Sequence, residues 1–336
     1  MDILKPYQER NNSLDSLTNH VTSVSSNKNA YLSNDQLLST FKCIENTCNM
    51  ISFCPHCSSS HIVKNGKNRL KKQRYKCKNC EKIFCSSTFS PLYHSKKSLN
   101  YWIKYLECMS NNLSVRSSAE KTGVHRNTAF YWRHKILHSL KSTLPNKLSG
   151  IIEIDETHFN QNNKDRSINY SLINVLSNEE IKIKVCVISC ADRYGNIFSK
   201  TACLNYANYS VVDAVIASKI PNNSILCTKN HYKYESFARK HKLEIHKISS
   251  NSFNSASIFN LSRVRYFHKS LHSLISKFRG VATKYMDLYI CWNKWNTLNS
   301  NVPLLQIIEN SLLDIISFGK NLRIKDFKFI NSLTFN

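Results

Sequence analysis

The chain has little glycine, little proline and few acidic side chains. Of its 336 residues, 6 are glycine, 6 are proline and 22 are Asp or Glu, against 47 Lys or Arg. Glycine normally makes up ~7% of a protein. Its scarcity, with abundant Asn, Lys, Ile and Ser, is typical of an AT-rich genome or of drift at weakly selected positions, and composition alone does not separate the two. The net charge of +25 excludes an ordinary near-neutral enzyme and favours a polyanionic partner, nucleic acid first and anionic membrane second.

Long apolar runs and a secretion signal are also lacking. No stretch approaches the ~20 apolar residues of a membrane span, so we expect no membrane association. The first residues, Met1-Asp2-Ile3-Leu4-Lys5-Pro6, do not follow the charged, apolar and small-residue series of a signal peptide. Without export, the 13 cysteines indicate metal ligands and reduced thiols instead of disulfides.

The positive charge is concentrated in one part of the chain. Residues 54–141 contain 18 Lys or Arg and 3 Glu, whereas residues 1–53 contain 4 basic and 5 acidic side chains. A local excess of this kind predicts a nucleic-acid-binding module in 54–141. The Ser- and Asn-rich residues 1–35 are expected to form a loose tail, followed by a short helix near 36–41.

Two cysteine pairs have the spacing of a zinc site. Cys54 and Cys57 form one C-x2-C pair, and Cys77 and Cys80 form another after 19 residues. Each pair supplies two thiolates from a tight turn, and together they close a tetrahedron around Zn²⁺. Because four thiolates leave no open coordination position, the metal is predicted to be structural.

Nine basic side chains lie between Lys64 and Lys82, within the cysteine-bounded module. They form either a solvated charged hairpin or a set of phosphate contacts, and the net charge favours phosphate. The candidate DNA contacts in this module are Lys71, Lys72 and Arg74.

A helix-turn-helix pattern follows. Residues 113–121 predict a first helix containing the small Ala119, Gly123 lies in the turn, and 125–133 predict a second helix with a polar start. The alternative is an ordinary helical hairpin, but the adjacent basic module favours DNA binding. In the second helix, Arg126, Asn127 and Arg133 are expected to face bases or phosphates in the major groove.

From Gly150 onward the pattern becomes strand-like. An apolar strand at 150–157 delivers Asp155 at its end, and another at 224–228 is followed by Lys229. Residues 192–196 predict a hairpin turn between strands at 181–188 and 197–202. Helices are expected at 209–218, 232–241, 262–278 and 303–317.

Together these blocks resemble the zinc-ribbon branch of bacterial insertion-sequence transposases, an ISXO2-like group of the DDE superfamily, over roughly residues 36–297. The resemblance rests on the following blocks: the ribbon at 75–80 with Phe84, then Leu99 and Trp102, the helix-turn-helix, residues 154–157, 176–179 and 226–228, then His231, Tyr234, Phe237 and Ala238, and the segment 278–285 with Tyr289 and Trp292.

This resemblance implies a multidomain protein: a zinc ribbon plus helix-turn-helix region, then an α/β ribonuclease-H-like core whose mixed sheet is flanked by helices. It implies cleavage and transfer of double-stranded DNA, with the element's terminal repeats and target as partners, a homodimer in synapsis, and a cytoplasmic, nucleoid-associated bacterial protein. The expected divisions are a tail (1–35), ribbon (36–90), helical DNA-binding region and linker (91–149), core (150–300) and helical extension (301–336).

The resemblance also implies two Mg²⁺ ions held by acidic side chains, and here the chain departs from the pattern. Asp155 matches the first ligand. The second position is Lys229, where the family has Asp, and the third is Arg265, where this branch has Asn or an acid; His272 replaces a usual Lys. Ammonium and guanidinium groups have no lone pair for Mg²⁺ and repel it. We therefore expect Mg²⁺ not to bind, Asp155 to pair with Lys229 or Arg265, and catalysis to be defective.

Other hypotheses remain open. The chain is an active transposase if Glu235 or Asp192 supplies the missing ligand; Glu156 is a poorer substitute, because neighbours on a strand point to opposite faces. Alternatively it is a zinc-dependent DNA-binding regulator that uses its core to dimerise. The leading hypothesis predicts about one zinc per chain, salt-sensitive binding to duplex DNA, and no Mg²⁺- or Mn²⁺-dependent nicking.

Overall fold

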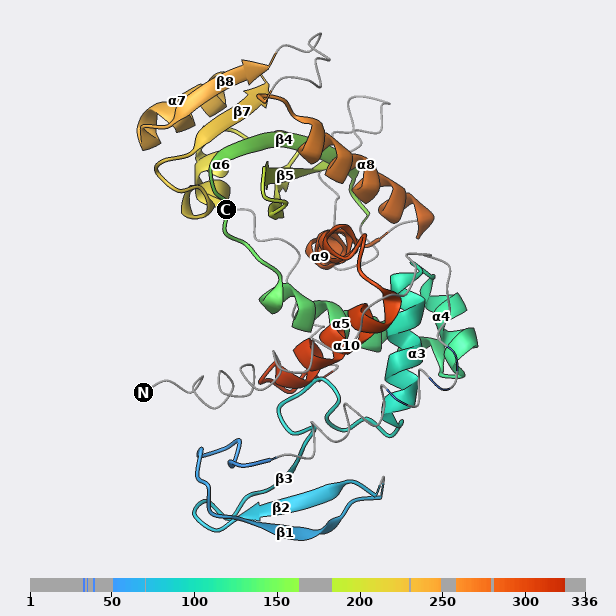
Figure 1. Ribbon diagram of the computed structural model, residues 1–336. Coiled ribbons are helices and arrows are strands. Elements are labelled where there is room, and N and C mark those ends of the chain that lie inside the picture. The colour runs from blue at the N-terminus through green and yellow to red at the C-terminus, as the bar shows by residue number, and fades with distance from the viewer. Residues whose placement is uncertain are drawn as a thin grey trace, which may run out of the picture. The chain divides into compact units, whose positions relative to one another are not determined.

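The computed structural model describes residues 51–69, 71–162, 183–229, 231–248, 258–278 and 281–323, with Ser33, Asp35 and Ser39 before them (Figure 1). The described chain divides into two compact units, one of residues 51–143 with 299–323 and the other of 144–298. Apart from Ser33, Asp35 and Ser39, the expected tail and the helix near 36–41 fall outside the described residues, as does the block at 176–179.

The first unit begins with a small antiparallel sheet. Its order is β1 (Ile62–Lys67), β2 (Gln73–Cys77), β3 (Ile83–Cys85). Its buried core consists of two cysteines and Phe84, with Tyr75 stacked on Phe84 at 5.9 Å between ring centroids. A core this small does not stabilise a sheet alone, so the segment needs a further constraint such as a metal ion.

Four helices complete this unit: α3 (Leu99–Ser110), α4 (Val115–Thr122), α5 (Arg126–Thr143) and α10 (Leu304–Ser317). The hydroxyl of Ser114 accepts a hydrogen bond from the Ser117 N–H at the start of α4, and Gly123 ends that helix with a φ of 65°. Trp102 and Trp132 stack between α3 and α5, with ring centroids 4.1 Å apart. Because α10 packs on α3 and α5, the C-terminal extension joins this unit.

The second unit is built on a five-stranded sheet in the order β6-β5-β4-β7-β8. The strands are β4 (Ile151–Asn160), β5 (Lys184–Asp192), β6 (Ile197–Leu204), β7 (Ile225–Lys229) and β8 (Glu244–Ile248). β4, β5 and β6 pair antiparallel, while β4, β7 and β8 are parallel. The parallel pairs are connected through α6 (Tyr209–Ile216) with the 3₁₀ turn η2 (Ala217–Lys219), and through α7 (Tyr232–His241).

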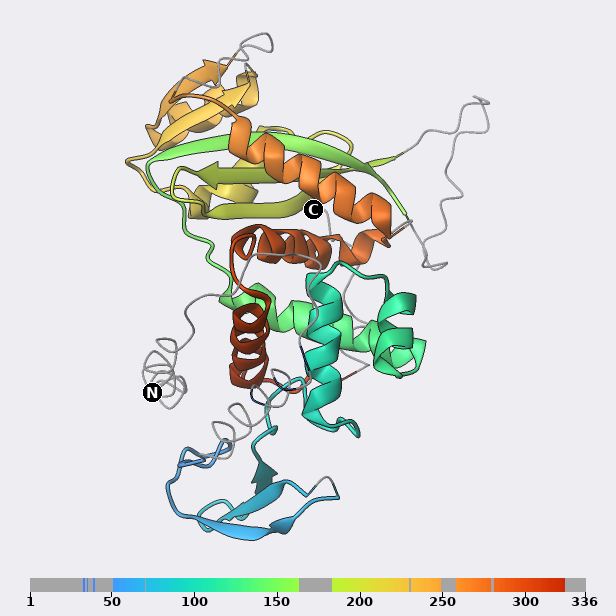
Figure 2. The same cartoon turned by 45° about the vertical axis from the view of Figure 1, so that its right-hand side comes forward.

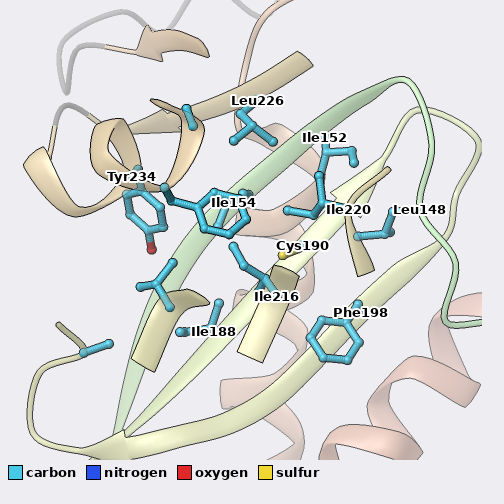
Figure 3. Close-up of a cluster of buried hydrophobic side chains, with 14 of the residues drawn as sticks. Leu148, Ile152, Ile154, Ile188, Cys190, Phe198, Ile216, Ile220, Leu226 and Tyr234 are labelled. Carbon is cyan, nitrogen blue, oxygen red and sulfur yellow. The ribbon is translucent and has the colours of Figure 1, made fainter. Parts of the chain in front are cut away.

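Helices cover both faces of this sheet (Figure 2). On one face, residues such as Ile152 and Ile154 pack against α6 and α7 (Figure 3). On the other face, Val187 and Cys227 pack against α8 (Ser262–Lys277) and α9 (Met286–Leu298), the latter preceded by η3 (Thr283–Tyr285). Alternate residues of β4 therefore enter different environments, which separates Asp155 from Glu156.

The hairpin turn and all four helices expected in and after the core are confirmed within a few residues, whereas β8 and α9 were not predicted. None of the helices among the described residues has the length and apolar character required to cross a bilayer.

Candidate functional site

The four predicted zinc ligands come together in the ribbon. All four Sγ atoms lie within 4.8 Å of one another; Cys54 and Cys80 are 3.6 Å apart, and Cys57 and Cys77 are 3.5 Å apart. A Zn–S bond of ~2.3 Å in a tetrahedron requires sulfur atoms ~3.8 Å apart. The thiols therefore fit Zn²⁺, and the site is closed because all four positions are protein ligands.

The two cysteine turns end on the same backbone conformation. The residues that follow them, Ser58 and Glu81, both have left-handed backbones, with φ of 57° and 56°. In the second turn the backbone N–H groups of Cys80 and Asn79 point at the Cys77 sulfur and lower the pKa of that thiol. These donors stabilise the thiolate form, which is the form that binds zinc.

The basic side chains of the ribbon face solvent. Lys71 and Arg74 are exposed and Lys72 is half-buried, and within the described residues no carboxylate pairs with any of the three. The turn between β1 and β2 is fixed by the Lys72 N–H, which donates to Asn68 Oδ1 at 2.9 Å. The cations are thus presented to a partner instead of being neutralised within the ribbon.

The start of α5 is also accessible. Arg126 and Asn127 are exposed in its first turn, and the Asn127 N–H donates to His125 Nδ1 at 3.2 Å, which caps the helix. The pair of helices with a glycine between them matches the sequence pattern, and these two side chains stay candidates for DNA contact.

The prediction for Arg133 is wrong. This residue has no exposed surface, and its Nη2 donates to the Leu113 carbonyl at 2.7 Å and to Ser118 Oγ at 3.4 Å. Arg133 lies about two turns along α5 from Arg126 and so on nearly the same side of the helix, but at that point this side packs against α4. Arg133 therefore fixes the two helices to each other and is not available to DNA.

In the second unit, Asp155 lies near the carboxyl end of the β4–β7 pairing and forms an ion pair with Lys229. Lys229 Nζ is 2.9 Å from Asp155 Oδ1, and the same oxygen accepts the Glu156 N–H at 2.9 Å. Asp155 is 6% exposed, whereas the Lys229 side chain is 51% exposed. The expected ion pair is confirmed, with Lys229 as the partner.

Helix α8 lies alongside this pair. His272 Nε2 is 2.6 Å from Thr157 Oγ1, and its ring stacks on Phe159 at 4.2 Å. Burial lowers the pKa of His268 to about 4, against the smaller opposing effect of the Asp155 charge. Arg265 is half-buried, and no described carboxylate lies within ion-pair distance of it.

The two acids considered as replacement metal ligands, Asp192 and Glu235, already bind other groups of the protein. Asp192 is fully buried, and its carboxylate accepts the N–H groups of Tyr194 and Asn196 at 2.9 Å, beside Ile152 at the start of β4. Glu235 pairs with Lys247 at 2.8 Å.

Two further acids on β4 have roles that the sequence did not reveal. Glu153 shares a face with Asp155, is completely buried, pairs with Arg193, and accepts the Val264 N–H at 2.9 Å. Glu156, on the other face, accepts hydrogen bonds from Lys233 and Tyr234. Neither has a partner nearby in sequence, so no local signal identified them.

The residues around Asp155 do not fit a divalent cation. The position next to its carboxylate is occupied by the Lys229 ammonium, and the His268 imidazole on the adjacent helix is close enough to interact with the Asp155 charge. Mg²⁺ requires several oxygen ligands in near-octahedral geometry. Within the described residues Asp155 is not part of any group of three or more potential metal ligands.

Comparisons with known proteins point to mobile elements. Residues 50–81 match the zinc ribbon of the InsA N-terminal domain family. A 115-residue segment is 29% identical to an uncharacterized protein in transposable element ISH50 of Halobacterium salinarum, covering 34% of this chain and 38% of that protein. The chain thus spans less than half of that relative's length. These matches relate the chain to insertion-sequence proteins.

Among solved structures, one match is the crystal structure of a pre-cleavage Mos1 transpososome. It is 11% identical and covers 68% of this chain and 82% of that chain, with a TM-score of 0.21. A TM-score this low carries no argument about fold or function.

Proposed function

We propose that this chain is an insertion-sequence transposase-family protein that binds duplex DNA through its zinc ribbon and the α4–α5 pair, and that has lost metal-dependent strand cleavage. The observation that carries the second half of this proposal is the ion pair between Lys229 and Asp155.

The DNA-binding half rests on charge and accessibility. The ribbon presents Lys71, Lys72 and Arg74 with no carboxylate paired to them in the described part of the chain, and α5 presents Arg126 and Asn127 at the end that follows the glycine turn. In a helix-turn-helix the N-terminal residues of the second helix contact base edges. We therefore assign phosphate contacts to the ribbon, and base or phosphate contacts to the start of α5.

The catalytic half rests on the arrangement of the sheet. A three-stranded antiparallel meander followed by two parallel strands agrees with a ribonuclease-H-like core, in which Asp155 is the first ligand position. Lys229 fills the second position and neutralises Asp155, and Arg265 brings a further positive charge on α8. Divalent ions at this site would face the Lys229 ammonium and one carboxylate that it already neutralises, and electrostatics oppose their binding.

The experiment combines binding and cleavage with the purified chain. Fluorescence anisotropy with a duplex carrying the element's own ends should show affinity that falls steeply with salt, because each phosphate contact releases a counterion. Arg74→Ala should reduce the slope of log K against log salt by about one, whereas Lys240→Ala, which removes a lysine paired with Asp213, should not.

The same DNA is then incubated with Mg²⁺ or Mn²⁺. We expect no nicking, and robust metal-dependent cleavage of these ends would overturn the catalytic half while leaving DNA binding intact. In that event, loss of cleavage in Glu235→Gln or Asp192→Asn would identify a shifted ligand. A zinc-dependent regulator is not favoured, because the matches are to proteins of transposable elements.

A further inference from the structure

A second group of potential metal ligands lies on the sheet face opposite Asp155. Glu156 and His158 on β4 and Cys186 on β5 each offer a ligand atom, and these atoms all lie within 4.8 Å of one another. In the described part of the chain, the ribbon quartet is the other such group. Register explains the arrangement: His158 pairs directly with Cys186, and Glu156 is two residues earlier on the same face.

A further thiol lies beside this group on β6, although its sulfur is not within 4.8 Å of all three ligand atoms. Cys203 is the direct cross-strand partner of Cys186, just before a register shift in the β5–β6 pairing. The two thiols are close enough to hydrogen-bond, and this contact lowers the pKa of Cys203 against the larger raising effect of burial. Cys186 is fully buried and Cys203 is 9% exposed. One thiol, an imidazole and a carboxylate therefore converge from β4 and β5, with the Cys203 thiol next to Cys186 on β6.

The imidazole of His158 provides an independent indication. Its Nε2 is buried and has no hydrogen-bond partner, while its ring packs 5.4 Å from the ring of Tyr206. A buried polar atom without a partner is costly, and such atoms in a folded protein call for an explanation such as an ion. Coordination of a metal by Nε2 removes this cost.

Glu156, like Asp155, is paired with a lysine, but this group adds anionic thiolates to its carboxylate, which the Asp155 position lacks. Glu156 Oε1 accepts the Tyr234 hydroxyl at 2.6 Å, whereas Oε2 faces Cys186 Sγ at 4.0 Å. Lys233 is 5% exposed, and its Nζ lies 2.8 Å from Oε2 and 3.1 Å from the Ala207 carbonyl. Zn²⁺ with two thiolates and one carboxylate carries one net negative charge, which the Lys233 ammonium balances. Tyr234 and Lys233 thus act as outer partners that orient the carboxylate.

We infer that Glu156, His158, Cys186 and Cys203 form a second zinc site, distinct from the ribbon and from the Asp155 position. Mixed sulfur, nitrogen and oxygen ligands select zinc over Mg²⁺, which takes oxygen ligands. The site ties the exposed end of β4 to β5 and β6, so its role is structural.

The test is the zinc content of the full-length protein after saturation with Zn²⁺ and removal of unbound metal. The wild type should contain two zinc ions per chain. His158→Phe keeps an aromatic ring beside Tyr206 but removes the nitrogen ligand, and should contain one. Cys57→Ser, which disrupts the ribbon instead, should also contain one, and the double variant none.

Cys190→Ser is the matched control, because Cys190 is a buried thiol on the same face of the same strand as Cys186, four residues further along. It should retain two zinc ions. One zinc ion in the wild type overturns the inference, as does an unchanged content of two in His158→Phe. Because His158 is only half-buried, a folding defect in that variant is not expected, and circular dichroism checks this directly.

Discussion

The Lys229–Asp155 ion pair supports a prediction that can be worked out in detail. The perturbation is the double variant Lys229→Asp, Arg265→Asn, which restores the ligand types of the family pattern. Since Asp155 is buried and Lys229 is half-exposed, the cost of breaking the pair lies between that of surface pairs and buried pairs. We expect the double variant to lose about 2 kcal/mol of unfolding free energy when no divalent ion is added.

Mg²⁺ or Mn²⁺ should then recover this loss. An ion present at 100 times its dissociation constant stabilises the folded state by about 2.7 kcal/mol. For a domain of this size that raises Tm by roughly 5–10 °C, at about 2–4 °C per kcal/mol. Thermal unfolding of the full chain, with zinc constant and Mg²⁺ titrated, measures the effect. The wild type should show no comparable rise.

A surface pair in the same unit provides the control. Lys240 Nζ is 2.8 Å from Asp213 Oδ2, with the lysine side chain 55% exposed, so Lys240→Asp makes the same charge change as the Lys229→Asp part of the double variant, beside an aspartate outside the candidate site. If the double variant gains no more from Mg²⁺ than Lys240→Asp does, or if Mg²⁺ stabilises the wild type equally, the assignment of Lys229 to a ligand position is refuted.

Three further predictions concern other parts of the chain. Arg133→Ala should lower the unfolding free energy by about 3 kcal/mol, because it removes a buried side chain that is hydrogen-bonded to α4 and the preceding turn. Arg126→Ala should weaken DNA binding but change the unfolding free energy by less than about 0.5 kcal/mol. Urea unfolding measures the first effect and fluorescence anisotropy with duplex DNA the second. Glu156→Gln should cost about 3 kcal/mol, since it leaves the buried Lys233 ammonium without its counter-charge, and urea unfolding measures this. Burial holds the folded-state pKa of His268 at about 4, below its unfolded value of ~6.5, so the unfolded chain binds the proton first. The neutral His268 therefore adds about 3 kcal/mol to the unfolding free energy above pH ~6.5, and this part of the stability is lost as the pH falls toward 4. His268→Leu should flatten the curve of unfolding free energy against pH over that range, and urea unfolding at several pH values measures it.

Local patterns predicted the elements of this chain well. The cysteine spacing located the ribbon, and the apolar period located α6, α7, α8 and α10 because each buries one face. Strand β8 was missed because its alternation is short and half-buried, and α9 because it is buried nearly all round and lacks a polar face.

For the candidate sites, residues brought together by local structure were predicted, and residues brought together by tertiary packing were not. Ligands close in sequence were found, since one turn delivers both cysteines of a pair. Arg133 was misassigned because a charged residue in a basic segment gives no sign of whether its helix face packs on α4. The role of Glu156 and the juxtaposition of His158 with Cys186 depend on strand register, which is fixed only when the sheet forms.

The backbone torsion angles connect the scarcity of glycine to the ribbon. Among the described residues, eight non-glycine positions have positive φ, against five glycines. Ser58 and Glu81, which follow the two cysteine turns, are among the eight, and a side chain in this conformation costs roughly 1–2 kcal/mol. Each turn is therefore less favourable without metal than a glycine-containing turn would be. Part of the free energy of zinc binding therefore offsets the cost of these two torsion angles. Because the chain uses Ser58 and Glu81 where glycine would be unstrained, the fold of the ribbon depends more strongly on bound zinc.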